Sequence, residues 1–223
     1  GPLASPTARQ GLSYAFPYDA YLKAAWRGYA KRNYGPLAST LLGYDPHMFH
    51  YTTDLNKAKA LLTRAGVTPG TTLTYSYVSG QQYFQIAGEL LQAQLQQIGI
   101  TVKLDQLDQA TYNTMFNGNE APGKRPNIMI QRWWPDYNDP WDESVSLIAS
   151  SSAGSAGNNG GYYHNTQVDN LLAKMKHAGG EAMRRYAAEM QDITSRVDPP
   201  AIWIDEPAQV VVAVRGLKGL IIN

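Results

Sequence analysis

The sequence predicts an α/β domain in which helices flank a central mixed sheet. Segments with the two-residue apolar alternation of strands recur along the chain, and segments with the helical periodicity of 3.6 residues separate them. A chain of 223 residues also buries roughly 70% of its surface on folding, enough for a core without disulfides or metals. No repeat or interior linker divides it, so we expect one domain over residues 1–223.

The N-terminal segment predicts helices that flank a loop rich in glycine and proline. Asp54 is an N-cap residue before an apolar stripe, and Gly66 has the position of a helix stop, so the helix between them has the strongest signal. The elements expected in this segment are helices at Thr7–Ala15 and Tyr18–Tyr29, a loop at Tyr34–Pro46, and a helix from Asp54 to Ala65.

The middle of the chain alternates between strands and helices. The order strand–helix–strand–helix–strand is typical of a sheet that is covered by helices. The expected elements are strands at Thr72–Val78, Ile100–Leu104 and Asn127–Trp133, and helices at Gln81–Ile98 and Gln109–Asn117.

The C-terminal third predicts three helices and two closing strands. Ser150–Gly161 is small, polar and rich in glycine, and therefore predicts a flexible surface loop. The other expected elements are helices from Trp141 to Ala149, at Gln167–Lys176 and at Glu181–Val197, and strands at Ala201–Asp205 and Gln209–Val214.

Composition excludes several classes of function. With 19 Lys and Arg against 18 Asp and Glu, there is no electrostatic case for binding nucleic acid. The absence of cysteine excludes disulfides, thiolate zinc sites and cysteine nucleophiles. His47 and His50 have the spacing of a metal pair, but no third ligand is visible, and we expect no metal site. The 15 tyrosines and 5 tryptophans suit a surface that faces a ligand.

The segment Trp133-Trp-Pro-Asp-Tyr-Asn-Asp-Pro-Trp141 has the densest functional signal. Aspartates beside tryptophans are the residue types of a glycosidase site, in which sugar rings stack on indoles. Their crowding instead favours one turn and one helix cap, with Asp139 before Pro140 as the cap. Trp133 and Trp134 leave a strand toward opposite faces, so one is expected in the core and the other outside. A ligand cleft at the strand end and a purely structural role both remain open.

Several motifs follow one another in the order of a known family. They are Ala8-Arg-Gln-Gly-Leu-Ser-Tyr-Ala15, Asp54-Leu-Asn-Lys-Ala-Lys-Ala-Leu-Leu-Thr-Arg-Ala-Gly66, Trp133-Trp-Pro-Asp-Tyr-Asn-Asp-Pro140, Tyr163-His-Asn165 with Val168-Asp-Asn-Leu-Leu172, and the closing segment from Pro199. Together they resemble the ABC-transporter solute-binding proteins of the oligopeptide, dipeptide and nickel class, family 5. The resemblance spans nearly the whole chain.

The resemblance implies a two-lobed fold, like that of periplasmic binding proteins, of which this chain is the second, C-terminal lobe and the first lobe is absent. Such a protein captures a solute in the periplasm or at the cell surface of a bacterium and delivers it to an ABC permease. It performs no chemistry and needs no cofactor. The expected partners are a short peptide, the permease and the missing first lobe. The alternatives are an oligosaccharide or opine as the solute and, in another class, an α/β hydrolase of glycosidase type.

The resemblance also implies a set of ligand-binding residues. Asp136 aligns with the aspartate that binds a peptide's α-amine in the oligopeptide binders of the family. Flanking aromatic residues place this carboxylate in partly dry surroundings, where an ammonium group interacts with it more strongly than in water. If Arg132 pairs with Asp136 instead, the pocket suits a neutral or anionic solute. The residues expected to bind the ligand are Gln131, Arg132, Trp133, Trp134, Asp136 and Tyr137.

Overall fold

The computed structural model describes residues 1–118, 122–134, 136–210 and 212–219. Its helices are α1 (Pro6–Ala15), α2 (Tyr18–Tyr21), α3 (Leu55–Arg64), α4 (Gln82–Gln96), α5 (Gln109–Asn117), α6 (Pro140–Ile148), α7 (Thr166–Met175) and α8 (Gly180–Asp192). The strands are β1 (Ala30–Arg32), β2 (Thr72–Val78), β3 (Thr101–Leu107), β4 (Ile128–Met129) and β5 (Asp205–Pro207). Short helical turns are η1 (Leu22–Trp26), η2 (Pro122–Lys124), η3 (Ser150–Ser152), η4 (Gly154–Ala156) and η5 (Ile193–Val197).

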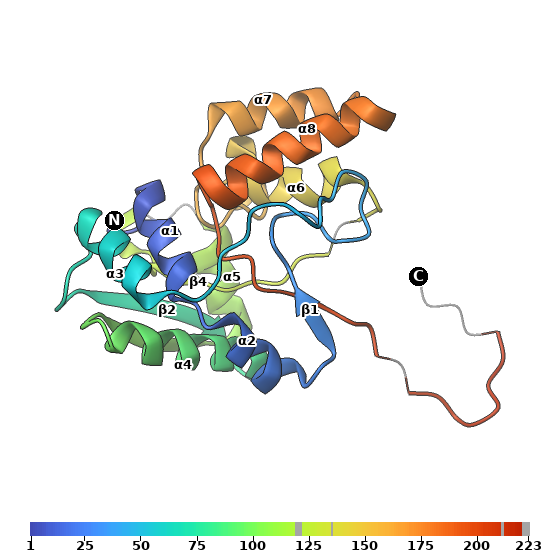
Figure 1. The fold of residues 1–223 in the computed structure, drawn as a ribbon. Helices are drawn as coiled ribbons and strands as arrows, with labels where there is room; N and C mark the ends of the chain where they lie inside the picture. Colours follow the sequence, from blue (N-terminus) through green and yellow to red (C-terminus); the bar gives the residue numbers. More distant parts are fainter. Residues whose placement is uncertain (119–121, 135, 211, 220–223) are drawn as a thin grey trace.

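These elements form two layers (Figure 1). The sheet layer comprises α1 to α5 with β2, β3 and β4, and the helical layer comprises α6, α7 and α8. The predicted α/β class is confirmed. The described strands divide into a parallel sheet of order β3-β2-β4 and a separate antiparallel ribbon of β1 and β5.

The sheet layer has β2 at its centre. β2 pairs with β3 over its whole length, from Thr72 opposite Thr101 to Val78 opposite Leu107. The odd-numbered residues of β2 face the core that includes α1, α3 and α4, whereas Val78 faces α5, because successive side chains of a strand alternate. Gly88 brings α4 close to this core, since a Cβ at this position would lie 2.5 Å from Cε1 of Tyr75.

The helix signals of the sheet layer are confirmed by its caps. The Asp54 carboxylate accepts a hydrogen bond from the backbone N–H of Lys57 at 2.9 Å, and α3 begins at the next residue. Gly66 has a φ of 82°, the left-handed conformation that ends a helix at low cost for glycine. Asp108 caps α5 in the same way, with its carboxylate 2.9 Å from the backbone N–H of Thr111.

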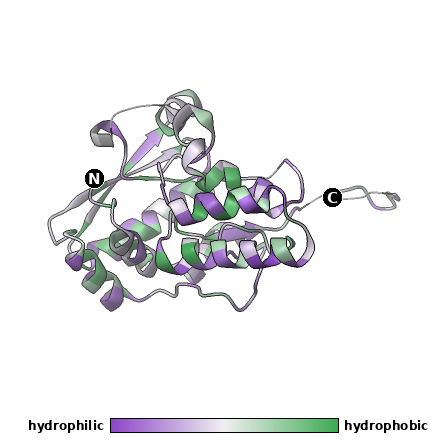
Figure 2. Ribbon diagram, turned by 90° about the horizontal axis from the view of Figure 1, so that it is seen from above, coloured by the Kyte–Doolittle hydropathy of each residue, from purple (hydrophilic) through white to green (hydrophobic). Residues whose placement is uncertain are grey.

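The helical layer packs α6, α7 and α8 around a core of its own. The buried hydrophobic residues of this core are Leu37, Leu41, Ile148, Ala149, Tyr163, Val168, Leu171, Leu172, Met175, Met183, Ala187, Met190 and Ile193. Figure 2 looks down on α7 and α8, which lie side by side with hydrophilic and hydrophobic residues alternating along each. This pattern is that of helices which bury one face only.

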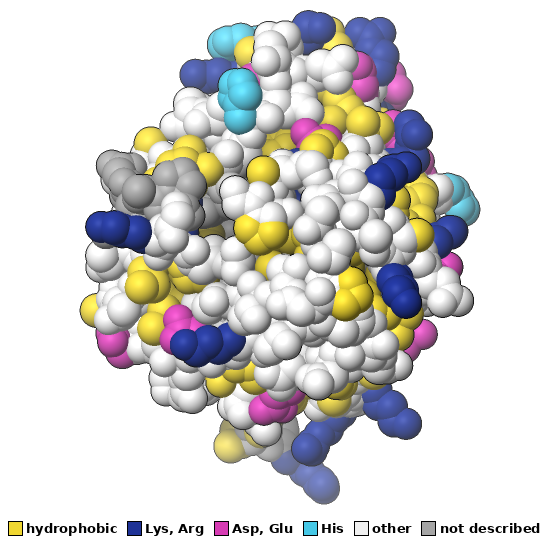
Figure 3. All heavy atoms as spheres, turned by 90° about the vertical axis from the view of Figure 1, so that its left-hand side faces the viewer, with side chains coloured by type: hydrophobic (Ala, Val, Ile, Leu, Met, Phe, Trp, Pro, Cys, Tyr) yellow, Lys and Arg dark blue, Asp and Glu magenta, His cyan; other side chains and the backbone are white. Residues whose placement is uncertain are grey.

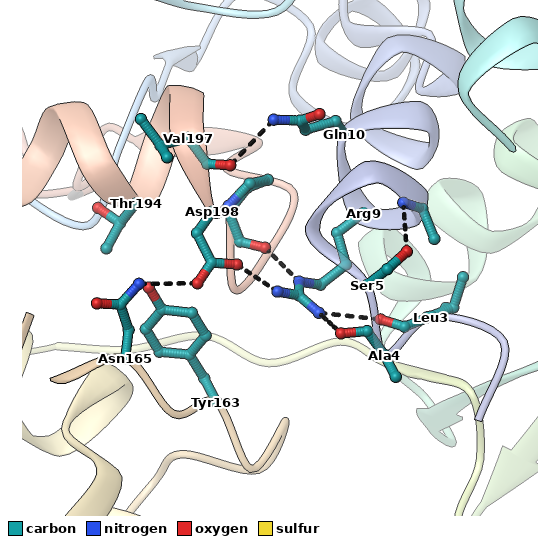
Figure 4. A network of polar contacts seen from close by, with 12 residues as sticks. Leu3, Ala4, Ser5, Arg9, Gln10, Tyr163, Asn165, Thr194, Val197 and Asp198 are labelled. Carbon is teal, nitrogen blue, oxygen red and sulfur yellow. Dashed lines mark hydrogen bonds and ion pairs between the residues drawn. The ribbon is translucent and has the colours of Figure 1, made fainter. Parts of the chain in front are cut away.

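A polar network joins the two layers (Figure 4). The Arg9 guanidinium, on α1, forms an ion pair with Asp198, which follows η5, and donates to the backbone oxygens of Leu3 at 3.0 Å, Ala4 at 2.6 Å and Pro199 at 2.7 Å. The other carboxylate oxygen of Asp198 accepts from the side-chain amide of Asn165 at 2.9 Å. Since Asn165 also caps α7, one arginine connects the start of α1 to the start of α7.

Three predicted strands differ from the structure. Only Ile128 and Met129 of the strand expected at 127–133 pair with β2, because the following backbone turns away to where the Ile130 carbonyl accepts from the Tyr112 hydroxyl. The strand expected at 201–205 is found at 205–207, because these are the residues of this segment that pair with β1. The strand expected at 209–214 is absent among its described residues, which exclude residue 211. There the chain leaves the body, with Val210, Val212 and Val214 exposed (Figure 1).

Two further predictions are corrected. The helix expected at 18–29 ends at Trp26, because Arg27 and Gly28 both take positive φ, at 51° and 95°, and the chain then enters β1. The segment 150–161 is packed rather than flexible. Asn159 is only 2% exposed, and its side chain bonds the backbone of Ala149 and Tyr163. Small residues are needed in this segment so that it can lie against its neighbours.

The surface mixes charges of both signs. On the face shown in Figure 3, basic and acidic side chains are interspersed, and hydrophobic side chains form small patches. None of the described helices has the length and apolar character needed to cross a membrane.

Candidate functional site

The candidate site is the segment from Gln131 to Asp139, which leads from β4 to α6. It lies beyond the carboxyl end of a parallel strand. In open α/β sheets, the crevice outside the carboxyl ends of the strands is where ligands bind. Position alone therefore favours this segment as the binding surface.

The N-terminus of α6 fixes the second half of the segment. The Asp139 carboxylate accepts from the backbone N–H groups of Trp141 at 2.8 Å and Asp142 at 3.3 Å, which confirms it as the predicted cap. The Asp142 carboxylate turns back and accepts from the backbone N–H groups of Asp136 at 2.8 Å and Tyr137 at 3.2 Å. These bonds hold the backbone, so the exposed side chains of Asp136 and Tyr137 start from a fixed position.

Glu143 lies beside this cap in buried surroundings. Its side chain is 7% exposed, and within the described part of the chain Oε2 has no hydrogen-bond partner. Burial, followed by the negative charges of Asp142 and Glu206, raises the pKa of Glu143 to about 7. The support of the candidate site therefore includes a carboxyl group that changes its charge near neutral pH.

Arg132 lies in a cluster of aromatic rings. Its guanidinium carbon is 4.4 Å from the ring centroid of Trp26, 4.4 Å from that of Tyr83 and 5.3 Å from that of Trp134. The same guanidinium forms an ion pair with Asp205 at 3.4 Å. The cluster joins η1, the first turn of α4 and β5 to the candidate segment.

Asp205 balances the charge of Arg132 from the β1–β5 ribbon. Its carboxylate also accepts a hydrogen bond from the Tyr21 hydroxyl at 3.3 Å. Burial raises the pKa of Asp205, and the nearby Arg132 opposes this shift. The pairing that was expected between Arg132 and Asp136 as one alternative is thus replaced by a pairing with Asp205.

The other predicted residues separate into two groups. Trp133 is partly buried and Trp134 is 63% exposed, so the two indoles take different environments as expected. Tyr137 is 55% exposed. The Gln131 side chain instead donates to the backbone oxygen of Asn158 at 3.3 Å, and is directed toward the packed segment 150–161.

Sequence reasoning missed three contributors to the site, Trp26, Tyr83 and Asp205, and considered Asp142 only as one of the aspartates of the glycosidase alternative. Tyr83 follows the carboxyl end of β2. Because the carboxyl ends of parallel strands meet at one edge of a sheet, the strand order expected from the sequence could have placed Tyr83 near the candidate segment. Asp205 is 73 positions from Arg132 and has no comparable local signal.

Two surface hollows lie elsewhere on the molecule. One of about 540 Å³ is lined by α5 together with Lys124 and Arg125. Another of about 400 Å³ is lined by residues of α1 and α3 with Phe49, Tyr51 and Arg196. Neither hollow is lined by described residues of the candidate segment.

Comparison with known proteins gives consistent matches. The chain is 29% identical over 222 residues to the probable D,D-dipeptide-binding periplasmic protein DdpA of Escherichia coli K12, and the match covers 100% of this chain and 42% of DdpA. The chain thus spans less than half the length of that relative. Among solved structures, HbpA2 from Haemophilus parasuis superposes with a TM-score of 0.82 at 22% identity, over 93% of this chain and 40% of HbpA2.

A second solved structure, DppA from Helicobacter pylori in complex with the peptide STSA, superposes with a TM-score of 0.79 at 26% identity, over 91% of this chain and 38% of that one. The sequence model of bacterial extracellular solute-binding proteins, family 5 Middle, matches residues 1–155, which is more than half of the chain. The chain therefore belongs to the bacterial extracellular solute-binding proteins of family 5.

Proposed function

We propose that this chain is the second lobe of an extracytoplasmic protein that captures short peptides for an ABC importer, and that Asp136 binds the α-ammonium group of the peptide. The observation that carries this proposal is the state of the Asp136 carboxylate. It is exposed, and within the described residues it has no hydrogen-bond or ion-pair partner. The nearby cation, Arg132, is engaged by Asp205 instead.

The surroundings of Asp136 suit an ammonium ion. Its backbone N–H is held by Asp142, and the exposed rings of Trp134 and Tyr137 are close in the chain. When a solute and an opposing lobe exclude water from this surface, the interaction between the two charges strengthens as the local dielectric falls. Charge-assisted hydrogen bonds of this kind are about twice as strong as neutral ones.

The relatives support a peptide as the solute. DdpA is named for binding D,D-dipeptides, and DppA from Helicobacter pylori was solved with the peptide STSA bound. The same family membership supports a binding role without chemistry, a location outside the bacterial cytoplasm and delivery to a membrane permease. The chain covers only about 40% of the length of each of these relatives, which leaves room in the full-length protein for an opposing first lobe.

An oligosaccharide or an opine is the second candidate solute. The exposed indole of Trp134 favours it, because sugar rings stack on such a surface. The two candidate solutes require different interactions with Asp136. A sugar needs a hydrogen-bond acceptor at this position, whereas a peptide needs a negative charge.

The test is calorimetry on a protein that contains both lobes, with free-amine and N-acetylated short peptides. Asp136→Asn is expected to weaken the binding of free-amine peptides by about 2–4 kcal/mol, with the free energy of unfolding unchanged within about 0.5 kcal/mol. Asp54→Asn is the matched control, since it removes the same charge while asparagine keeps the α3 cap.

Two results contradict the proposal. One is unaltered affinity of Asp136→Asn for free-amine peptides. The other is equal binding of N-acetylated and free-amine peptides by the unmodified protein. The isolated chain should bind peptides weakly or not at all, because it offers about half of the contacts of a closed cleft. Sub-micromolar binding to this chain alone would overturn the requirement for a second lobe.

A further inference from the structure

We propose that Trp134 is a stacking platform that selects peptides with an aromatic N-terminal side chain, and that Arg132 beneath it disfavours cationic ones. This inference rests on the proposed function, because it takes the peptide's ammonium group to lie at Asp136. It adds a preference for one class of side chain, which nothing in the binding of the ammonium group requires.

The first step is the environment of the indole. Trp134 is 63% exposed, although the Gln131 side chain before it and the Asp136 backbone N–H after it are each hydrogen bonded. The Arg132 guanidinium lies 5.3 Å from the ring centroid of Trp134. An indole with one side against a fixed cation and most of its surface in solvent has a free face for a ligand.

The second step is the rigidity of that support. The Arg132 guanidinium lies against the rings of Trp26 and Tyr83, with each ring centroid 4.4 Å from its carbon, and these two rings stack on each other with centroids 5.5 Å apart. Asp205 fixes the same guanidinium from the ribbon. Arg132 therefore acts as a positioning residue for Trp134, since it loses little freedom when a ligand binds.

The third step is the chemistry that fits the free face. A second aromatic ring stacks on an indole in an offset arrangement and gains both apolar burial and electrostatic attraction. A cationic side chain is attracted by the ring face as well, but Arg132 already uses this attraction from the other side and repels a like charge. The order expected at Trp134 is therefore aromatic above small aliphatic, with no advantage for lysine.

The fourth step identifies which side chain reaches Trp134. A single residue separates Trp134 from Asp136 in the sequence, so their Cα atoms are at most about 7 Å apart. The N-terminal residue of a peptide has its ammonium group and its side chain on one Cα, and thus spans this distance. The next Cα of the peptide is about 3.8 Å further along. The selected side chain is therefore the first one.

The test is titration of the 223-residue chain with the free-amine tripeptides Phe-Ala-Ala, Ala-Ala-Ala and Lys-Ala-Ala, followed by ¹H–¹⁵N NMR. The spectrum resolves the five tryptophan indole N–H groups, and Trp134→Phe assigns one of them. Phe-Ala-Ala is expected to bind about tenfold more tightly than Ala-Ala-Ala, and to shift the Trp134 signal most. Peptide concentrations on the order of 10 mM reach the weak affinity expected of one lobe.

Three variants separate the contributions. Trp134→Ala is expected to remove the tenfold preference and to leave the affinity for Ala-Ala-Ala within about twofold. Tyr29→Ala, which removes a similarly exposed ring outside the cluster, is the control and should keep the preference. The double variant Arg132→Gln/Asp205→Asn removes both charges of the ion pair. It should raise the affinity for Lys-Ala-Ala relative to Ala-Ala-Ala about threefold and, because Arg132 no longer positions Trp134, reduce the preference for Phe-Ala-Ala.

The outcomes distinguish this inference from the function on which it rests. Equal affinity of the unmodified chain for all three tripeptides overturns the inference alone. A preference for Phe-Ala-Ala that survives in Trp134→Ala assigns the selection to another residue and overturns it as well. If no free-amine tripeptide binds this chain at the highest concentration, the titration is repeated on a protein that contains both lobes, and absence of binding there overturns the proposed function together with the inference.

Discussion

The two layers of the molecule differ in what they bury. In the sheet layer the core is aliphatic and aromatic, and its buried polar side chains are Ser13 and Ser76. The helical layer and the segments packed with it bury many more polar side chains: Asp142, Glu143, Ser144, Ser152, Asn159, Gln191, Thr194 and Ser195. The stability that comes from apolar burial does not depend on pH. The contribution of a buried polar group depends on its hydrogen bonds and, for an acid, on its charge. The candidate site is built where these two kinds of interior meet.

The largest effect is expected from a cavity in the sheet layer. Leu91 is fully buried on α4, and Leu91→Ala should lower the free energy of unfolding by about 3–4 kcal/mol, equally at pH 5 and pH 8. Chemical denaturation at both pH values measures this. The neighbouring and only partly buried Leu90 is the control, and Leu90→Ala should lose less than half as much. A strong pH dependence of the Leu91→Ala effect would contradict the contrast between the layers.

The junction of the layers gives the next largest effect. Arg9→Ala leaves one oxygen of the Asp198 carboxylate and three backbone oxygens without the donor that Arg9 supplies, and should lower the free energy of unfolding by about 2–3 kcal/mol. A double-mutant cycle with Asp198→Asn should give a coupling energy above about 1 kcal/mol. Gln85→Ala is the control, since the Gln85 side chain bonds only Glu89 within α4 and spans no junction. Additive effects of Arg9→Ala and Asp198→Asn would show that the ion pair does not couple the layers.

Glu143 tests the polar interior through pH. Its pKa rises from 4.5 in the unfolded chain to about 7 in the fold, so the folded state binds the extra proton between these values. Stability therefore falls as the pH rises from 4.5 to 7, and Glu143→Gln should exceed the parent by about 2 kcal/mol at pH 8 and match it near pH 4. Denaturation curves across this range measure the difference.

A matched control for that experiment is Glu181→Gln, because Glu181 is an exposed acid on α8 whose change should leave the pH profile unaltered. A Glu143→Gln variant that differs from the parent by the same amount at every pH would refute the titration of this group.

The smallest effects are expected from two helix caps, one in each layer. Asp54→Ala and Asp139→Ala should each lower the free energy of unfolding by about 1 kcal/mol. Only Asp139→Ala should also weaken peptide binding, because it loosens the start of α6, from which Asp142 holds Asp136. Calorimetry and denaturation on the same samples separate the two readouts. Equal binding by both variants would mean that the cap does not support the site.

The helices of both layers and the central strand are the parts that the sequence predicts best. Periodicity and caps are local signals, and the helix from Asp54 to Ala65, the strand Thr72–Val78 and the helix that follows it are all found. The closing strands at 201–205 and 209–214 are predicted less well. A high valine content indicates extended backbone, but a strand also needs a neighbouring strand to pair with. β1 is only three residues long and pairs with Asp205–Pro207 alone.

The candidate site shows the same limit. Asp139 was identified as a cap from its position before Pro140, which is local information. The partners of Arg132 come from η1, α4 and β5, and no pattern within a few residues of Arg132 indicates them. Long-range geometry also decided that Asp205, rather than the adjacent Asp136, neutralises Arg132.

The valine-rich segment after β5 has a consequence for the behaviour of the protein in solution. Residues 208–214 contain no charged side chain, and Val212 is 93% exposed. An uncharged, exposed stretch of β-branched residues is a template for cross-strand pairing between molecules, and charges at its end act as gatekeepers against aggregation. Arg215 and Lys218 are the gatekeepers available here. We therefore expect this segment, rather than either folded layer, to set the concentration at which solutions of the chain become turbid.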